Sequence, residues 1–384
     1  MDFSWSKEYT DYRNSVIEFA KSELDDDTLV QRDHEGTFPQ NLWDKCGKFG
    51  ILGLAAPARY GGTFEEVDLM RAAYALEGLG YGCPDVGLNL ALNAHLWTVV
   101  MTITIFGDEA QKKKYLPKMS SGEWIGAHAL TEINSGSDVY EMKTTAKKVD
   151  GGYILNGEKR LVTLAPIANV AVVFANSKPE LGKWGVSAFI VDETMQGFER
   201  QPVQQKMGLR TAPIGRLKFT DCFVPDKNRL GREGAGFSIC NHSLEYDRCC
   251  ILAGKLGAMQ RQLEQSIEYA KSRQQFGQPI GKFQSVSNRI ADMKLRLETS
   301  RLLLYKMAWL KKNDKPAMLE AAMLKLHLGE AYVASSLDAI RIHGGSGYLT
   351  EHEVERSLRD AVGGVIYAGT SDIQRNIIAK FLGL

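Results

Sequence analysis

The sequence predicts a mainly α-helical protein with an all-β insert near its middle. Apolar residues recur with the 3.6-residue period of amphipathic helices before residue 120 and again after residue 236. Between these regions the pattern changes to short alternating runs separated by turn dipeptides. We therefore expect an N-terminal helical domain over 1–124, a central β-barrel or sandwich over 125–232 and a C-terminal four-helix bundle over 233–384.

The bulk composition is that of a globular chain. It has 384 residues, of which 44% are hydrophobic and 24% charged, enough to build a sizeable core. A net charge of +1 argues against nucleic acid or an anionic membrane as a partner. We expect no transmembrane helix, because no run of about 18 apolar residues is seen, and segment 1–8 lacks the features of a signal peptide. The six cysteines show no CxxC spacing, so we expect reduced thiols in a cytoplasmic protein and no metal site.

The N-terminal region contains several helical patterns. Periodic apolar residues mark helices near 12–20, after Pro39, over 69–79 and over 89–106. His95 lies in the last of these helices. A lone histidine on an apolar helix face is usually a hydrogen-bonded core residue, so we expect His95 to be structural.

The central region carries two hairpin signals. Residues 144–149 alternate in polarity and end at Asp150-Gly151, and 153–155 end at Asn156-Gly157. Such dipeptides between alternating runs are strong turn signals, so both are interpreted as turns. Further short strands are expected at 170–175, 186–191 and 216–220.

The C-terminal region returns to helical periodicity. The segment Asn313–Pro316 combines turn-forming residues with a proline and separates two long patterns. The expected helices are 237–272, 283–312, 316–343 and 370–382.

Three separated motifs now point to one family. Residues 129–138 read ALTEINSGSD, 273–280 read RQQFGQPI and 342–348 read IHGGSGY. In this order and spacing, together with KMGLR at 206–210, they resemble the acyl-CoA dehydrogenase family over nearly the whole chain. The helical, β, helical order expected above is also that family's order.

The resemblance implies FAD as the cofactor and an acyl thioester as the substrate. By resemblance, the Leu130 backbone and the Thr131 hydroxyl face the flavin ring, Thr163 lies near its reactive nitrogen, and Gly136 and Ser137 meet the pyrophosphate. Each flavin would be shared between subunits of a homodimer or homotetramer. Residues implied to reach a neighbouring subunit's FAD are Arg273, Gln275, Phe276, Gln284, Arg341, His343, Gly344 and Gly345. Thr370 and Asp372 would meet the adenosine half of the FAD.

One departure from the family concerns the catalytic base. The commonest members carry a glutamate where this chain has Ala368, although the backbone N–H of that position, which donates to the thioester oxygen, is retained. A second branch carries its base on the helix after the β domain, just before an Arg or Lys. That position is Asp247, followed by Arg248. The resemblance also implies substrate contacts at Ser137, Arg248, Tyr367 and Gly369.

Asp247 is the expected base, but alternatives remain open. Aspartate is shorter than glutamate by roughly 1.5 Å, and a displacement near 1 Å can cost about a hundredfold in rate. Asp247 could instead pair with Arg248 or cap a turn. Glu245 is the fallback base. It precedes Asp247 by two positions, so on a helix its side chain should point to another face. Apolar surroundings should raise the pKa of Asp247.

Other departures from the family pattern indicate which branch of the family the chain resembles and which electron acceptor it uses. Leu161 stands where the family usually has an aromatic shield over the flavin, which puts an electron-transfer flavoprotein partner in doubt and favours access of dioxygen. Residues 283–298 resemble the prolyl-carrier-protein dehydrogenases of pyrrole biosynthesis. We therefore expect an FAD-dependent dehydrogenase of an acyl or aminoacyl thioester on a carrier protein, with CoA as the second choice. The alternatives are an acyl-CoA dehydrogenase or oxidase of ordinary metabolism, and a non-catalytic flavin-binding partner.

Overall fold

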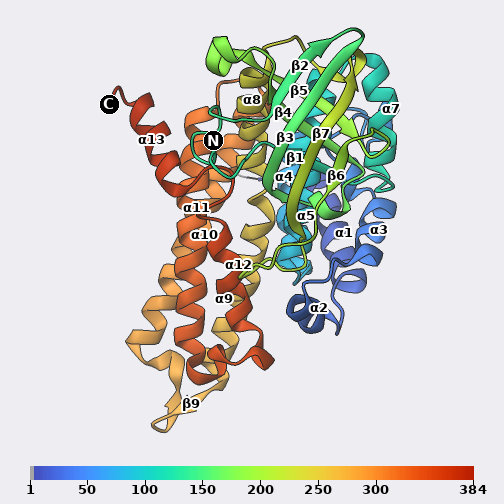
Figure 1. The fold of residues 1–384 in the computed structure, drawn as a ribbon. Helices are drawn as coiled ribbons and strands as arrows, with labels where there is room; N and C mark the ends of the chain where they lie inside the picture. The colour runs from blue at the N-terminus through green and yellow to red at the C-terminus, as the bar shows by residue number, and fades with distance from the viewer. Residues whose placement is uncertain (1–3) are drawn as a thin grey trace.

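The computed structural model describes residues 4–384, and the strands and N-terminal helices lie together at one end of a long helical bundle (Figure 1). Met1–Phe3, part of the segment considered above for targeting, lie outside the described residues. The far end of the bundle carries the small hairpin that contains strand β9 (Gln274–Gln275).

The N-terminal helices begin at side-chain caps where the sequence supplies them. Asp68 accepts hydrogen bonds from the backbone N–H groups of Met70 and Arg71, and Asp108 forms a capping box with Gln111. The helices are α1 (Lys7–Glu23), α2 (Leu29–Glu35), α3 (Gln40–Phe49), α4 (Leu69–Gly82), α5 (Val86–Asn93), α6 (Met101–Phe106) and α7 (Glu109–Ser120), with a π-helix η3 (Ala94–Val100) between α5 and α6.

The segment Val86–Phe106 bears on the expectation that the chain has no transmembrane helix. By length and composition alone it is long and apolar enough to cross a membrane. However, 94% of its apolar window is buried inside the protein, so it forms the central helix of the core. His95 lies in this segment, where its Nε2 is 3.1 Å from the Met119 carbonyl oxygen and its Nδ1 accepts from Gly126 N–H at 2.9 Å. The expectation that His95 is structural is confirmed.

The central strands enclose a second core. Alternate residues of β4 point to opposite sides: Val172 packs toward the helices, and Val173 packs between the strands. The strand order is β6-β7-β3-β2-β4-β5-β8, and β1 pairs with β4. The strands are β1 (Gly126–Ala129), β2 (Thr145–Val149), β3 (Gly152–Thr163), β4 (Val170–Asn176), β5 (Val186–Asp192), β6 (Phe198–Arg200), β7 (Ile214–Pro225) and β8 (Arg229–Leu230).

Of the two expected hairpin turns, only one forms. Asp150-Gly151 turns as predicted, but Asn156 and Gly157 lie inside β3. The Asn156 side chain accepts from Asp221 N–H at 2.8 Å and donates to Asp221 Oδ1 at 3.0 Å, so it is bonded across to β7. A register shift between Leu155 and Gly157 absorbs the irregularity as a β-bulge.

The bundle differs from expectation at two places. The expected helix 237–272 is interrupted at Ile251–Leu252, and α12 was not predicted. Helices α9, α10 and α11 pack against one another, while α12 and α13 pack on α11. The helices are α8 (Gly236–Cys250), α9 (Ala253–Ser272), α10 (Gln284–Lys312), α11 (Met318–His343), α12 (Val354–Gly363) and α13 (Ser371–Phe381), and hairpin strands β9 and β10 (Gln278–Pro279) follow α9.

The N-terminal domain and the bundle meet at a backbone contact between α4 and α9. A Cβ atom on Gly80 would lie 1.8 Å from the Gly254 carbonyl oxygen, and one on Gly257 would lie 2.0 Å from the Glu77 carbonyl oxygen. Only glycine permits so close an approach. A buried ion pair of 2.7 Å between Arg301 and Glu77 joins α10 to the same crossing.

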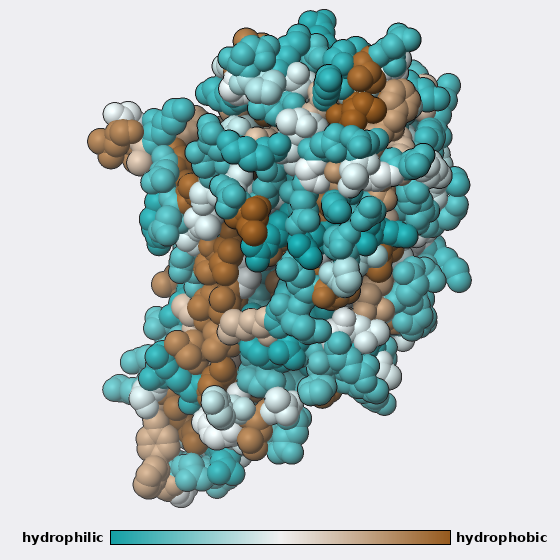
Figure 2. Space-filling view, in the orientation of Figure 1, coloured by the Kyte–Doolittle hydropathy of each residue, from teal (hydrophilic) through white to brown (hydrophobic). Residues whose placement is uncertain are grey.

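The bundle surface carries an apolar stripe, which Figure 2 shows as a brown band along its length. On α10 the exposed residues Leu295, Leu302 and Trp309 are spaced by seven, so they share one face. Met323 and Leu337 are exposed on the neighbouring helix α11. An apolar stripe of this kind marks a contact surface.

Candidate active site

Helix α8 holds Asp247 inside the protein. Asp247 is only 4% exposed, and α8 packs against η3, α6 and α11 around it. One turn earlier, the Ser243 hydroxyl accepts from the Thr102 hydroxyl of α6 at 3.0 Å. This bond fixes the rotation of α8 and with it the direction of Asp247.

Asp247 has the electrostatics of a buried base. Its Oδ1 is buried and has no hydrogen-bond partner among the described residues. Burial raises the pKa of Asp247 to about 7, against the opposing effects of the positive charges on Arg248 and Lys325. The expected rise is therefore confirmed. Among the described residues Asp247 forms no ion pair with Arg248, so the pairing alternative finds no support.

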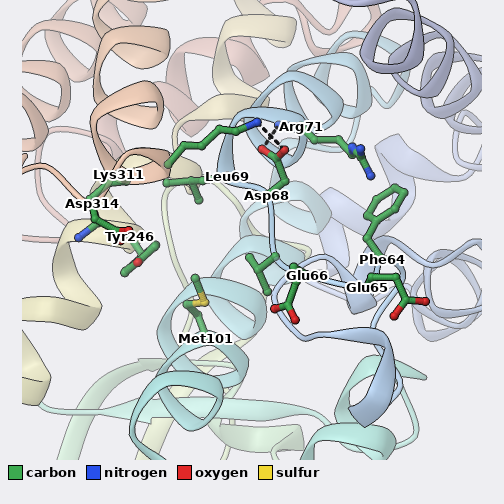
Figure 3. A pocket seen from close by; sticks show the side chains of 12 residues that line it. Phe64, Glu65, Glu66, Asp68, Leu69, Arg71, Met101, Tyr246, Lys311 and Asp314 are labelled. Atoms are coloured by element: carbon green, nitrogen blue, oxygen red, sulfur yellow. Dashed lines mark hydrogen bonds and ion pairs between the residues drawn. The ribbon is translucent and has the colours of Figure 1, made fainter.

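Glu245, the fallback base, faces elsewhere. Its carboxylate pairs with Lys311 of α10 at 2.8 Å. The adjacent Tyr246 lines a cavity of about 600 Å³ between α4, α6, α8 and α10 (Figure 3). Neither Asp247 nor Ala368 lines this cavity, so we assign it no part in the chemistry.

A tight turn before α13 presents the Ala368 backbone. Ala368 and Gly369 both have positive φ angles, 55° and 86°. The Ala368 carbonyl accepts from Arg248 Nε at 3.3 Å and from Gln374 Nε2 at 3.1 Å. No group in the described chain accepts from the Ala368 N–H, so this donor is free for a ligand. The Thr370 hydroxyl accepts from Ile373 N–H and caps α13.

Buried polar groups surround this turn without partners. The Tyr367 hydroxyl and the amines of Lys255 and Lys325 are buried and make no hydrogen bond within the described residues. Sequence reasoning missed Lys255, Lys325 and the turn-holding Gln374. The available signal was a lysine at an apolar position of a helical pattern, as in Leu324-Lys325-Leu326.

The β domain presents a separate set of groups that fits FAD. The buried Lys159 amine donates to the Leu130 carbonyl at 3.0 Å and pairs with Glu132 at 2.8 Å, which fixes the loop after β1. On this loop and the end of β3, the Thr131, Ser137 and Thr163 hydroxyls make no hydrogen bond within the described chain. Free donors on a rigid support are what flavin oxygen and phosphate atoms require. Gly136 and Leu161 are exposed beside them.

The residues assigned to the neighbouring subunit's FAD lie at the other end of the bundle with β9, whereas Thr370 and Asp372 lie at the start of α13 (Figure 1). Tyr269 connects them, since its carbonyl accepts from Arg273 N–H at 2.8 Å and its ring stacks on His343 at 4.2 Å. Phe276 is 93% exposed at the hairpin tip. One chain therefore does not bring this group to the β-domain group. Arg341 pairs with Asp338 at 3.2 Å, and the exposed Asp372, on α13, pairs with Arg375 at 2.9 Å. The exposed members of the distant group are Arg273, Gln275, Phe276, Gln284, Arg341, Gly344 and Gly345.

Comparisons with known proteins identify the family and its similar members. Three family models match in order: the N-terminal domain of acyl-CoA dehydrogenase over 6–123, the middle domain over 127–222 and the C-terminal domain over 234–383. An L-prolyl-[peptidyl-carrier protein] dehydrogenase from Pseudomonas fluorescens is 41% identical, with both chains covered completely. The prolyl acyl carrier protein oxidase AnaB has 50% identity and a TM-score of 0.97, covering 99% of this chain and 100% of its own. PigA with FAD and proline has 40% identity and a TM-score of 0.97, with both chains covered completely. The expected fold class and the resemblance to this branch are confirmed.

Proposed function

The chain belongs to the acyl-CoA dehydrogenase family, and from this we propose that it is an FAD-dependent dehydrogenase that oxidises the Cα–Cβ or an equivalent bond of a carrier-protein-tethered acyl or aminoacyl thioester in a biosynthetic pathway. A prolyl group is the first candidate, because the similar proteins named above act on prolyl or bind proline. A CoA thioester is the alternative.

One observation carries the proposal. Arg248 donates to the carbonyl of Ala368, so the residue that follows the base is bonded to the turn with the free N–H. The contact therefore joins the residue next to the buried carboxylate to the residue that carries the unused N–H donor. This is the combination that abstraction of an α-proton requires, because charge develops on the thioester oxygen as the proton leaves.

The chain's own groups divide the work. Asp247 takes the α-proton on its carboxylate, and a pKa of about 7 places it near the ideal range for a general base at neutral pH. The Ala368 N–H donates to the thioester oxygen. Arg248 and Gln374 hold that N–H in place through the carbonyl of the same residue. FAD, when bound, supplies the acceptor for the hydride from the β-carbon.

FAD is held by two copies of the chain in this proposal. Thr131, Ser137 and Thr163 of one copy would hold the ring and pyrophosphate side, and Thr370 and Asp372 would meet the adenosine half. The distant group around Arg273, Phe276 and His343 would come from the neighbouring copy. The apolar stripe on α10 and α11 is a matching contact surface for a homo-oligomer. We keep the domain boundaries 1–124, 125–232 and 233–384 and a cytoplasmic location as part of the proposal.

Anaerobic flavin absorbance tests the proposed function. The purified protein is offered prolyl and short acyl groups, each on a carrier protein and on CoA, and bleaching of the oxidised flavin is followed. We expect fast bleaching with prolyl carrier protein. Bleaching by CoA esters alone would reassign the enzyme to ordinary acyl metabolism. A bound flavin that no thioester bleaches would overturn the catalytic proposal in favour of a non-catalytic partner.

A further inference from the structure

An exposed apolar patch lies where the β domain meets the start of α8. Leu181 and Trp184 belong to the short helical segment η5 (Pro179–Gly185) and are 51% and 55% exposed. The Trp184 ring meets the Phe237 ring of α8 edge-on, with 4.8 Å between the ring centres. These three residues, here called the α8 patch, are separate from the apolar stripe on α10 and α11. Clustered exposed apolar side chains of this kind mark a contact surface.

Positive side chains border the α8 patch. Lys183 Nζ lies 5.2 Å from the ring centre of Trp184 and 4.8 Å from that of Phe237. Arg232 is exposed on the loop before α8. That loop packs closely on the patch, since a Cβ atom on Gly234 would lie 2.7 Å from the Trp184 carbonyl oxygen. The apolar rings and both cations therefore belong to one surface.

This positive charge is largely uncompensated. Lys178 pairs with Glu233 at 2.9 Å. Lys183 and Arg232 form no ion pair among residues 4–384, and Glu180 is the only other acidic residue within 178–185 and 231–237. A phosphopantetheine arm is joined to its carrier protein through a phosphodiester, so the carrier surface is anionic where the arm leaves it. Charge complementarity therefore favours such a partner at the patch.

The α8 patch adjoins the loop that carries Thr131 and Ser137. Tyr140 follows Ser137 by three residues, and its ring packs against Phe237 with 4.9 Å between the ring centres. The Tyr140 hydroxyl donates to Asn241 Oδ1, one turn further along α8, at 3.3 Å. The patch is thus in contact with the loop whose free hydroxyls are assigned to FAD.

Helix α8 also connects the patch to the Ala368 turn. The helix is unbroken over Gly236–Cys250, and Phe237, Asn241 and Arg248 are spaced by four and seven residues, so they share one face. The eleven residues from Phe237 to Arg248 correspond to roughly 16 Å along the helix. Arg248 then donates to the Ala368 carbonyl. An extended phosphopantetheine arm can span this length.

We propose that the α8 patch is the docking surface of the carrier protein, which places the base of its phosphopantetheine arm beside Lys183 and Arg232 and directs the arm along α8 toward the Ala368 turn. This inference rests on the proposed function, because only a tethered substrate brings a second protein to the site. The carrier protein covers the exposed rings of Leu181 and Trp184 in the complex. A substrate on free pantetheine makes no use of this contact.

The test compares one prolyl group on a carrier protein, on CoA and on free pantetheine. Anaerobic flavin bleaching of the FAD-loaded enzyme gives the half-saturating concentration of each form. Trp184→Ala should raise that concentration about tenfold for the carrier-protein form and by no more than about twofold for the other two. Lys183→Glu combined with Arg232→Glu should act in the same way, and added salt should reduce the effect. Phe223→Ala on β7 and Lys113→Glu on α7, both exposed, are the controls.

Binding provides a second readout that does not depend on turnover. The carrier protein is titrated against the FAD-loaded enzyme by calorimetry, once with its unacylated arm and once without an arm. Both patch variants should weaken both forms, because the contact is between protein surfaces.

Three outcomes would overturn the inference. If either patch variant leaves the half-saturating concentration of the carrier-protein form unchanged, the inference is wrong, and bleaching by the wild type keeps the proposed function. Equal increases for the carrier-protein and pantetheine forms would assign the patch to the arm or to the fold, and an equal increase for the CoA form would make it a nucleotide contact. If no thioester bleaches the flavin, the proposed function fails and this inference fails with it.

Discussion

The region around Asp247 and the far end of the bundle around Phe276 differ in how far their residues are exposed. Around Asp247 the charged groups Arg248 and Lys325 are buried, and several polar atoms there lack partners within the described residues. Around Phe276 the hairpin residues are exposed, and the Phe276 ring, 93% exposed, has Phe283 as an aromatic neighbour at 6.0 Å. In the proposed function the first region acts within one chain, whereas the second contacts the flavin of a neighbouring copy. Proton abstraction and cofactor binding would then depend on different levels of assembly.

The largest expected effect is at the base. Asp247→Asn should lower the rate of anaerobic flavin bleaching by about a thousandfold, because the carboxylate that accepts the proton is lost. FAD content should be unchanged. Glu245→Gln is the matched control on the same helix, and its rate should stay near that of the wild type. Bleaching by Asp247→Asn at the wild-type rate would show that another group is the base.

The second largest effect is expected at Phe276, at the far end of the bundle. Phe276→Ala should weaken FAD retention by about tenfold or more, because a large aromatic contact to the neighbouring copy is removed. The FAD-to-protein ratio after gel filtration measures it, and Phe223→Ala, an exposed phenylalanine on β7, is the control.

Mixed oligomers sharpen the same comparison. If each site takes Asp247 from one copy and Phe276 from the next, co-expressed Asp247→Asn and Phe276→Ala chains form some sites with neither defect. Activity should then exceed that of either variant alone. Hybrids no more active than the separate variants would mean that each flavin site belongs to one chain.

A smaller effect concerns the charge beneath Asp247. Because the proton acceptor must be ionised, kcat/KM should rise with pH through a midpoint near 7. The positive charge of Lys325 lowers the pKa of Asp247, so Lys325→Met should move this midpoint to higher pH. A shift of about one pH unit lowers the ionised fraction of Asp247 at pH 7 several-fold, so activity should fall several-fold at pH 7 and recover at pH 9. Lys306→Met, an exposed lysine of α10, should leave the profile in place. An unshifted profile in Lys325→Met would remove Lys325 from the account.

The smallest effect is expected at the turn. Ala368→Gly should change the rate by no more than about threefold, because the donor is the backbone N–H and glycine accepts a φ of 55° freely. Stopped-flow bleaching and the FAD content measure this. A hundredfold loss would instead assign the methyl group a part in substrate positioning.

Much of the fold could be predicted because periodicity is local. The α10 helix was expected at 283–312 and forms over Gln284–Lys312, and strand 170–175 appears as β4. The elements that were missed depend on distant partners. Strand β1 (GAHA) lacks β-branched residues and exists through its parallel pairing with β4. The Asn156-Gly157 signal failed because a bond to Asp221 on β7 outweighed the local turn preference.

The candidate site divides in the same way. Asp247 and the Ala368 turn were found because motif position marks them. For Lys255 and Lys325 the sequence offered only a lysine at an apolar position of a helical pattern, because a buried group without a partner is recognisable only when all its neighbours are known. The separation of the FAD residues into two distant groups was likewise a matter of tertiary arrangement, although the resemblance had implied a shared flavin.

The backbone contact between α4 and α9 also bears on how the enzyme works over time. Because Gly80 meets Gly254 with no side chain between them, the two helices cannot slide or tilt without a clash. The N-terminal domain and the bundle should therefore behave as one rigid body during turnover, and loading and release of the thioester must proceed without a hinge at this crossing.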